Sequence, residues 1–146
     1  MMAIQNTVRL ASMLLAMTGW AAAGTLHVDA NYPGCPGTGV PGDSFCLIQD
    51  AINVASNGDV ILVRPGTYFE SSDYLGKTIE VRSTLGATMT RIQGNPGGAV
   101  VSIIISGEGP QTLLQGFEIT GGRSGIVILG SSPRIRLNWI HGNSPS

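Results

Sequence analysis

The most constraining stretch of this chain is residues 48–70, IQDAINVASNGDVILVRPGTYFE, in which a helical pattern runs directly into short strands. Its first part has apolar residues at three- and four-residue spacing, which places them on one face of a helix. An Asn-Gly pair then predicts the end of that helix. A Val-Ile-Leu-Val run predicts a covered strand, and Arg-Pro-Gly predicts a corner after it.

The predicted helix covers residues 46–56, with Ser44 as its N-cap, because a serine hydroxyl can accept from the free N–H groups of the first turn. A first strand is predicted over residues 25–30, where apolar and polar residues alternate. Gly, Pro, Ser or Asn separate nearly all the later segments. These predicted strands cover residues 60–63, 67–70, 78–82, 89–92, 100–105, 113–120, 126–129 and 135–140.

The strands fall into two interleaved series with steps of 19 to 26 residues. One series contains Val60, Ile79, Val101 and Ile126, and the other is centred on Tyr68, Arg91, Phe117 and Asn138. The best internal match is a shift of 21 residues, which moves Leu114, Phe117, Ile119 and Gly122 onto Ile135, Asn138, Ile140 and Asn143. A repeat of this length, with short strands and no helix inside it, predicts the coil of a β-solenoid. We therefore expect aliphatic columns through the coils, with Ile79, Val101 and Ile126 stacked in one of them.

The expected fold class is all-β, a right-handed parallel β-helix of about four coils whose short N-terminal α-helix caps the first coil. The last predicted strand, over residues 135–140, is followed only by His-Gly-Asn-Ser-Pro-Ser. Because no capping segment follows, we expect an open C-terminal edge that can pair with another chain. The simplest interpretation is a truncated version of a longer solenoid.

The first 23 residues have the pattern of a signal peptide, with Arg9, an apolar run over residues 10–20 and Ala21-Ala22-Ala23 at the cleavage site. The apolar run is shorter than the ~20 residues that a membrane span needs. An uncleaved anchor helix is the alternative. Residues 24–146 then form the β-helix domain, and we expect export to the periplasm, the cell surface or the medium.

Charged residues make up only 12% of the chain, and the formal net charge is −1. No block of basic residues is present, which argues against nucleic acid as a partner. No later segment is long and apolar enough to cross a bilayer, and no cofactor is expected.

Both cysteines, Cys35 and Cys46, lie in one Pro- and Gly-rich loop. Because an exported chain meets an oxidising compartment, the natural expectation is a disulfide between them. Two free thiols are the alternative. Metal binding is not expected, since two cysteines without nearby histidines make a poor zinc site.

Together these features resemble the right-handed parallel β-helix, or pectin-lyase-like, superfamily over residues 25–143. The segment Gly66-Thr67-Tyr68-Phe69-Glu70 fits the G-x-Y-x-E pattern of pectin methylesterases, in which it is mostly structural. The resemblance implies the N-terminal part of a secreted β-helix repeat protein. It is specific for the fold and says little about activity.

The catalytic sets of related enzymes are not found. The paired aspartates and arginine of the methylesterases are missing, and so is the pair of carboxylates that a glycosidase needs. Glu70, Asp73 and Glu80 are interpreted as a scattered acidic surface rather than the calcium site of a pectate lyase. His27 and His141 have no nucleophile near them, so catalytic residues stay unassigned.

The candidate ligand-binding residues are Arg134, Arg136 and Trp139. Both arginines flank an inward Ile135 and should face outward, where two guanidinium groups side by side could clamp a uronate carboxylate. The alternative is that they are solvated arginines that discourage edge pairing. Trp139 and Tyr74 could stack on a sugar ring if their side chains are exposed.

The sequence therefore predicts an exported repeat protein without a recognisable catalytic set. We expect it to bind a polysaccharide or another cell-surface partner, or to be structural and self-associate through the open edge. The alternative is the N-terminal part of an enzyme, a lyase, hydrolase or esterase, that acts on an acidic polysaccharide.

Overall fold

The structure is a computed structural model that describes residues 22–104 and 109–145. These residues form one helix, α1 (Ile48–Val54), and twelve short strands. The strands are β1 (Thr25–Val28), β2 (Val60–Val63), β3 (Gly66–Phe69), β4 (Ser72–Asp73), β5 (Glu80–Ser83), β6 (Thr90–Gln93), β7 (Ala99–Ile104), β8 (Leu113–Gln115), β9 (Glu118–Thr120), β10 (Ser124–Leu129), β11 (Arg134–Arg136) and β12 (Trp139–Ile140).

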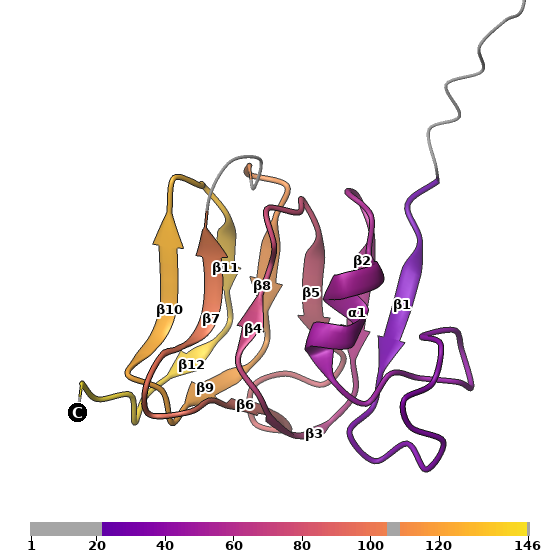
Figure 1. Ribbon diagram of the computed structural model, residues 1–146, viewed down its shortest axis with the longest axis horizontal. Helices are drawn as coiled ribbons and strands as arrows, with labels where there is room; N and C mark the ends of the chain where they lie inside the picture. Colours follow the sequence, from indigo (N-terminus) through magenta and orange to yellow (C-terminus); the bar gives the residue numbers. More distant parts are fainter. Residues whose placement is uncertain (1–21, 105–108, 146) are drawn as a thin grey trace, which may run out of the picture.

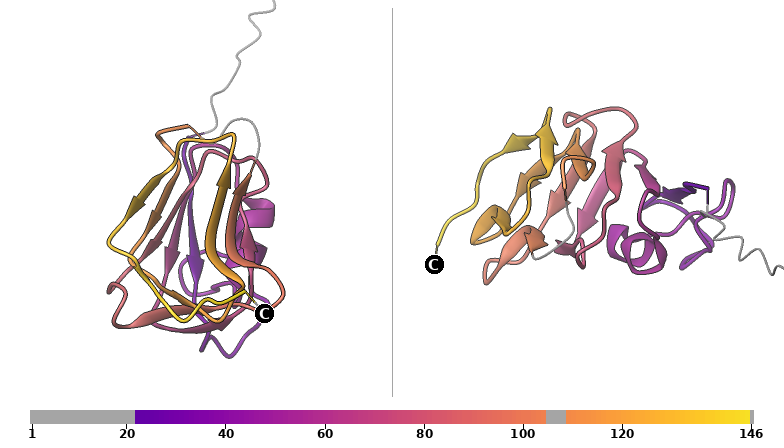
Figure 2. Two further views of the ribbon diagram at one scale, coloured as in Figure 1. Left: turned by 90° about the vertical axis from the view of Figure 1, so that its left-hand side faces the viewer. Right: turned by 90° about the horizontal axis from the view of Figure 1, so that it is seen from above.

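The strands form three sheets with the orders β1-β2-β5-β8-β11, β3-β6-β9-β12 and β4-β7-β10. Neighbouring strands within every sheet are parallel. From β2 onward the chain visits the three sheets in turn, so the neighbours in each sheet come from successive rounds (Figure 1). A view along the stack shows three walls around a common interior, which is consistent with a β-solenoid (Figure 2).

Side chains of successive rounds stack in register inside the walls. In one column Ile61 pairs with Val81, Val81 with Leu114, and Leu114 with Ile135. The predicted 21-residue shift is confirmed there, since it relates Leu114 to Ile135 and also relates Ile119 to its strand partner Ile140. Burial of these aliphatic side chains contributes most of the stability of such a stack, at about 1.5–3 kcal/mol for each.

The predicted column of Ile79, Val101 and Ile126 is wrong in part. Val101 and Ile126 are strand partners in the third sheet, but Ile79 precedes β5 in a different sheet. The reason is β4, which has only two residues and therefore gives no periodic signal. Without it, the sequence pattern counted two strands in a round that has three.

Two predicted strands are each divided by a corner. The segment 113–120 breaks at Gly116, which has a φ of 84°, and the segment 135–140 breaks at Leu137, which has a φ of 54°. A left-handed residue turns the chain from one sheet into the next, and glycine adopts that conformation without steric cost. Leu137 is a leucine in the same conformation, so the sequence offered no signal for this second corner.

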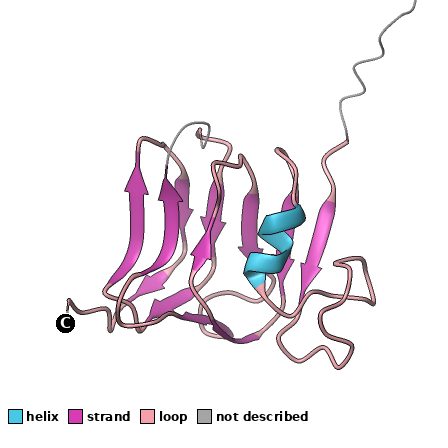
Figure 3. Cartoon of the chain, viewed as in Figure 1, coloured by secondary structure: helices cyan, strands magenta, loops and turns pink. Residues whose placement is uncertain are grey.

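The helix is shorter than predicted, Ile48–Val54 instead of 46–56, and its predicted N-cap is wrong. Ser44 is buried outside the helix, and the N-cap position is Leu47, without a side-chain cap. The Asn57-Gly58 pair lies beyond the helix, in the turn before β2. The helix buries Ile48, Ala51 and Ile52 and lies beside β1, β2 and β4 (Figure 3).

The interior also contains two tyrosines, and both hydroxyls are bonded. Tyr74, 1% exposed, donates to the carbonyl of Leu113 at 2.8 Å. Tyr68 donates to the carbonyl of Arg64 and accepts from the backbone N–H of Ala30. Burial raises the pKa of Tyr68 to about 12, and it also raises the pKa of Tyr74 well above its ordinary value. Because Tyr74 is buried, the exposure that stacking on a sugar would require is met by Trp139 and not by Tyr74.

The predicted disulfide between Cys35 and Cys46 is present. It closes a loop that covers the outer edge of β1: Phe45 donates to the carbonyl of His27 and accepts from the N–H of Asp29, and Gly39 accepts from the N–H of His27. The edge of the first sheet is thereby protected from pairing with another chain. Within residues 22–104 and 109–145, no helix has the length and apolarity to cross a membrane.

Candidate functional site

The richest group of functional side chains lies on the outward side of the β3-β6-β9-β12 sheet. Tyr68, Ile92 and Ile119 of this sheet are strand partners and point into the core. Side chains alternate along a strand, so the residues on either side of them point outward. We call this surface the outer face; its residues are Thr67, Phe69, Arg91, Gln93, Glu118, Thr120, Trp139 and His141.

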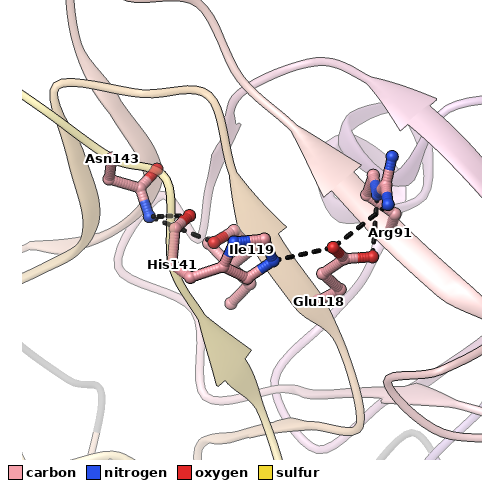
Figure 4. Close-up of polar contacts among 5 residues, drawn as sticks. All are labelled: Arg91, Glu118, Ile119, His141 and Asn143. Carbon is pink, nitrogen blue, oxygen red and sulfur yellow. Dashed lines mark hydrogen bonds and ion pairs between the residues drawn. The ribbon is translucent and has the colours of Figure 1, made fainter.

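Glu118 lies at the centre of the outer face and has partners on both sides. Its carboxylate accepts from Arg91 Nε at 2.7 Å and from Arg91 Nη2 at 3.1 Å, which is a bidentate ion pair. On the other side, His141 Nε2 lies 2.7 Å from Glu118 Oε1 (Figure 4). The side chain of Glu118 is only 9% exposed although it points outward, since its neighbours cover it. These contacts hold the carboxylate in one orientation.

The charges of this group cancel. The hydrogen bond from Arg91 holds the pKa of Glu118 below its ordinary value against an opposing effect of burial, and His141 contributes in the same direction as Arg91. Glu118 in turn raises the pKa of Arg91. A general acid needs a raised pKa, so this carboxylate is suited to accepting hydrogen bonds and not to donating a proton.

An aromatic pair borders Glu118 on the side of β12. Trp139 is the strand partner of Glu118, and its ring lies 4.2 Å from that of His141, with 30° between the two planes. Trp139 is 57% exposed, which leaves much of the indole free for a ligand. Backbone bonds fix both residues, since Trp139 N–H donates to the carbonyl of Phe117 and His141 N–H to that of Ile119.

Asn143 secures the segment after β12. Its side-chain amide donates to the carbonyls of Ile119 and His141 (Figure 4). Its side-chain oxygen accepts from the N–H of Gly122. Asn138 makes the matching bonds at the preceding corner, to Phe117 N–H and to the carbonyl of Leu114. These asparagines hold β12 and His141 against β9, so the aromatic pair stands on a supported strand.

The three predicted ligand-binding residues do not share one surface. Arg134 and Arg136 point outward on β11, as predicted, whereas Trp139 lies past the Leu137 corner in another sheet. Arg134 Nη2 lies 3.2 Å from Glu80 Oε1, and Glu80 also pairs with Arg82 at 3.1 Å. Arg136 makes no ion pair with any described residue. Arg134 and Arg136 are thus adjacent as predicted, but only Arg134 forms an ion pair with Glu80.

The acidic residues that were considered for calcium lie in separate settings, in agreement with a scattered arrangement. Glu70 binds the helix terminus, Asp73 accepts from Leu75 N–H, and Glu80 binds two arginines. Burial raises the pKa of Glu70 against the opposing effect of its backbone hydrogen bonds. Across residues 22–104 and 109–145, no three His, Cys, Asp or Glu side chains converge as a metal site would require.

A second polar region lies where β1, β2 and β5 end. A hollow of about 520 Å³ is lined by Asp29, Asn31, Arg64, Pro65, Thr84 and Leu85. An adjoining hollow of about 300 Å³ shares Asp29 and Arg64, which form a single long contact of 3.4 Å. His27 lines the second hollow. Tyr32 also lines the second hollow and is partly exposed, but neither hollow is lined by an aromatic side chain as exposed as that of Trp139.

Sequence reasoning identified Trp139 but missed Glu118, Arg91 and Phe69. A signal for Glu118 was present, because the 21-residue shift that relates Ile119 to Ile140 also relates Glu118 to Trp139. Arg91 carried no such signal, since 27 residues separate it from Glu118. Comparison of the chain with protein-family models, with curated proteins and with solved structures found no match.

Proposed function

We propose that this protein is a non-catalytic glycan-binding repeat protein whose outer face holds a sugar against Trp139. The observation that supports this function is the half-exposed indole of Trp139 directly beside the fixed carboxylate of Glu118. The apolar face of a sugar ring stacks on an indole, and its hydroxyl groups bond to planar carboxylate, guanidinium and imidazole groups at the ring edge.

The side chains of the outer face are already held in place, so binding a ligand requires little further ordering of them. Arg91 and His141 already hold Glu118, and the strand bonds of β12 already hold Trp139. A ligand that meets side chains in their bound positions avoids the entropy cost of ordering them. Such a face can therefore bind a sugar without a deep pocket.

The absence of a second carboxylate on the outer face argues against hydrolysis there. Glycosidases work with two carboxyl groups at a defined separation, one of them with a raised pKa. Among the described residues of the outer face Glu118 is the single acid, and its pKa is lowered. The face fits recognition better than bond cleavage.

An enzyme is the second candidate, and one contact favours it. A carboxylate that bonds to an imidazole can orient it as a general base, and Glu118 lies 2.7 Å from His141 Nε2. In this case the chain would be the N-terminal part of a protein active on an acidic polysaccharide, with Arg134 and Arg136 available for a uronate. Turnover of a polyuronate by the protein would establish this alternative.

The finer features of the fold belong to the same proposal. We infer a right-handed β-helix of the pectin-lyase-like kind with about four coils and with α1 as its N-terminal cap. The order in which the chain visits the sheets supports the coils, and the contacts of α1 with β1, β2 and β4 support the cap. The G-x-Y-x-E segment supports the kinship, because Tyr68 is buried and Glu70 binds the helix.

Export and self-association are further parts of the proposal. The disulfide supports an oxidising compartment. The proposed signal peptide falls almost entirely on residues 1–21, which lie outside the described residues. Self-association would use the edges of β10, β11 and β12, which are the last strands of their sheets. Size-exclusion chromatography over a range of concentrations tests this part separately.

The direct test is a binding titration of the exported chain against a panel of neutral and acidic oligosaccharides. We expect Trp139→Ala to weaken the binding of the preferred sugar about tenfold. Leu85→Ala is the matched control, because Leu85 is 63% exposed and lies outside the outer face. Equal loss in both variants, or no binding to any sugar, would refute the proposed function.

A further inference from the structure

Phe69 is the most exposed aromatic residue of the described chain whose ring has no partner. It is 73% exposed and lies at the end of β3, which is the edge strand of its sheet. Phe69 is in β3, at the opposite end of the outer face from Trp139. An exposed phenyl ring held on a strand offers an apolar surface on which a ligand ring can stack.

The register places Phe69 in one row with His141 and places Trp139 at the end of the neighbouring row. Phe69 pairs with Gln93, Gln93 pairs with Thr120, and His141 follows on the next strand, held to Ile119 by its N–H. The row beside it runs from Thr67 through Arg91 and Glu118 to Trp139. Three strand spacings of about 4.8 Å separate the two aromatic ends, which is about 14 Å. Each strand thus presents side chains at an interval comparable with the length of one sugar residue.

The charge of the outer face identifies the class of ligand. Arg91 and Glu118 neutralise each other, and Thr67, Gln93 and Thr120 are neutral groups that both donate and accept hydrogen bonds. The arginine-bearing face of β5 and β11 differs, since Arg82, Arg134 and Arg136 face one acid, Glu80. An acidic sugar would find no unpaired cation on the outer face, because Arg91 is already paired with Glu118. A neutral sugar needs no such cation and can bond to the polar groups of the face.

We propose that the outer face binds a neutral polysaccharide chain along the long axis of the molecule, with Phe69 as a second stacking residue opposite Trp139. This inference rests on the proposed function and adds the class, the direction and the length of the ligand. The bound chain crosses β3, β6, β9 and β12, so it contacts both aromatic ends only when it has about four sugar residues.

The test is a titration of neutral gluco-, xylo- and manno-oligosaccharides from disaccharide to hexasaccharide, with oligogalacturonides as the acidic series. For the preferred neutral series we expect affinity to rise with length until both ends are reached. Phe69→Ala should weaken the binding of the tetrasaccharide and longer ligands about three- to tenfold and leave the disaccharide unchanged. Phe69→Trp should restore the loss, which a mere change of folding would not do.

The outcomes separate this inference from the proposed function. One outcome is that Trp139→Ala weakens binding, Phe69→Ala leaves binding unchanged, and affinity does not depend on the length of the ligand. This outcome would overturn Phe69 as a second stacking residue and leave the sugar site at Trp139. Preference for oligogalacturonides would overturn the neutral class. No binding of any oligosaccharide would overturn both proposals together.

Discussion

Glu70 closes the N-terminal end of α1 by accepting the backbone N–H of Ile48 at 2.9 Å, from 22 residues further along the chain. Its second oxygen accepts the N–H of Gln49 at 2.8 Å. Helix termini leave such N–H groups without intrahelical partners, and the residue that directly follows β3 supplies the acceptor here. The G-x-Y-x-E segment thus joins the first helix to the first full round of strands.

We expect Glu70→Ala to lower the free energy of unfolding by about 1–2 kcal/mol, because two helix N–H groups lose their acceptor. Glu70→Gln should lose less, since its amide oxygen still accepts one bond and burial no longer opposes a charge. Urea denaturation measures both variants. A glutamine variant as unstable as the alanine variant would contradict this account of the cap.

The ion pair of Glu118 should make stability depend on pH. The folded-state pKa of Glu118 lies below its ordinary value of 4.5. The ionised carboxylate therefore stabilises the folded chain fully above pH 4.5, and this stabilisation is lost as the pH falls through the folded-state pKa. We expect Glu118→Gln to be less stable than the natural chain at neutral pH. The difference should disappear in acid, as followed by denaturation from pH 7 to pH 3. A difference independent of pH would exclude the ion pair as its cause.

The hydroxyl of Tyr74 is expected to stabilise the interior. Tyr74→Phe removes the donor to the carbonyl of Leu113 and leaves that buried group unpaired, at a cost of about 1–2 kcal/mol. Tyr32→Phe is the control, because Tyr32 also donates one bond, to Asp43, but near the surface. Thermal unfolding compares the two. Equal effects would show that burial of the hydroxyl is not the deciding factor.

The same isoleucine-to-alanine change should lower the free energy of unfolding by different amounts at two paired positions. Ile119 is fully buried and Ile140, its strand partner, is 47% exposed. We expect Ile119→Ala to cost about 2–4 kcal/mol, through lost burial and a cavity, and Ile140→Ala clearly less. Chemical denaturation of both variants is the measurement. Equal costs would mean that Ile140 is covered in solution, for example by a second copy of the chain.

The disulfide is expected to keep the cover on β1. Replacing Cys35 and Cys46 by serine should lower stability by about 2–3 kcal/mol, since the closed loop restricts the unfolded chain. Loss of the cover should also make residues 31–46 the first site of limited proteolysis. A variant with the natural pattern of cleavage would show that the hydrogen bonds of Phe45 and Asp43 hold the loop without the covalent link.

The local pattern was sufficient for most elements of the fold. The alternation in Glu80, Val81 and Arg82 placed Val81 inside, and the run from Val60 to Val63 predicted a covered strand. Cys35 and Cys46 had one plausible partner each. These features depend on residues close together in the chain, where period and spacing have direct physical meaning.

The register between rounds was less accessible. Loops of different length separate the strands, so a two-residue strand such as β4 was missed and Ile79 was assigned to the wrong column. The 21-residue shift succeeded between the last rounds, where Asn138 and Asn143 occupy the corners opposite Phe117 and Gly122. A corner of constant length keeps the sequence spacing between strands of successive rounds the same, whereas a loop of variable length changes it.

By itself the sequence determined the local elements of the molecule: short alternating strands, one amphipathic helix, a loop with a disulfide, and outward side chains for Arg134 and Arg136. Only the tertiary structure decided which of these side chains meet. It turned the chain at Leu137 and thereby separated the arginines from Trp139, and it brought Arg91 and His141 to Glu118 across 27 and 23 residues. The physical reason is that strand pairing depends on backbone bonds between rounds, and those bonds are indifferent to the side chains that they align.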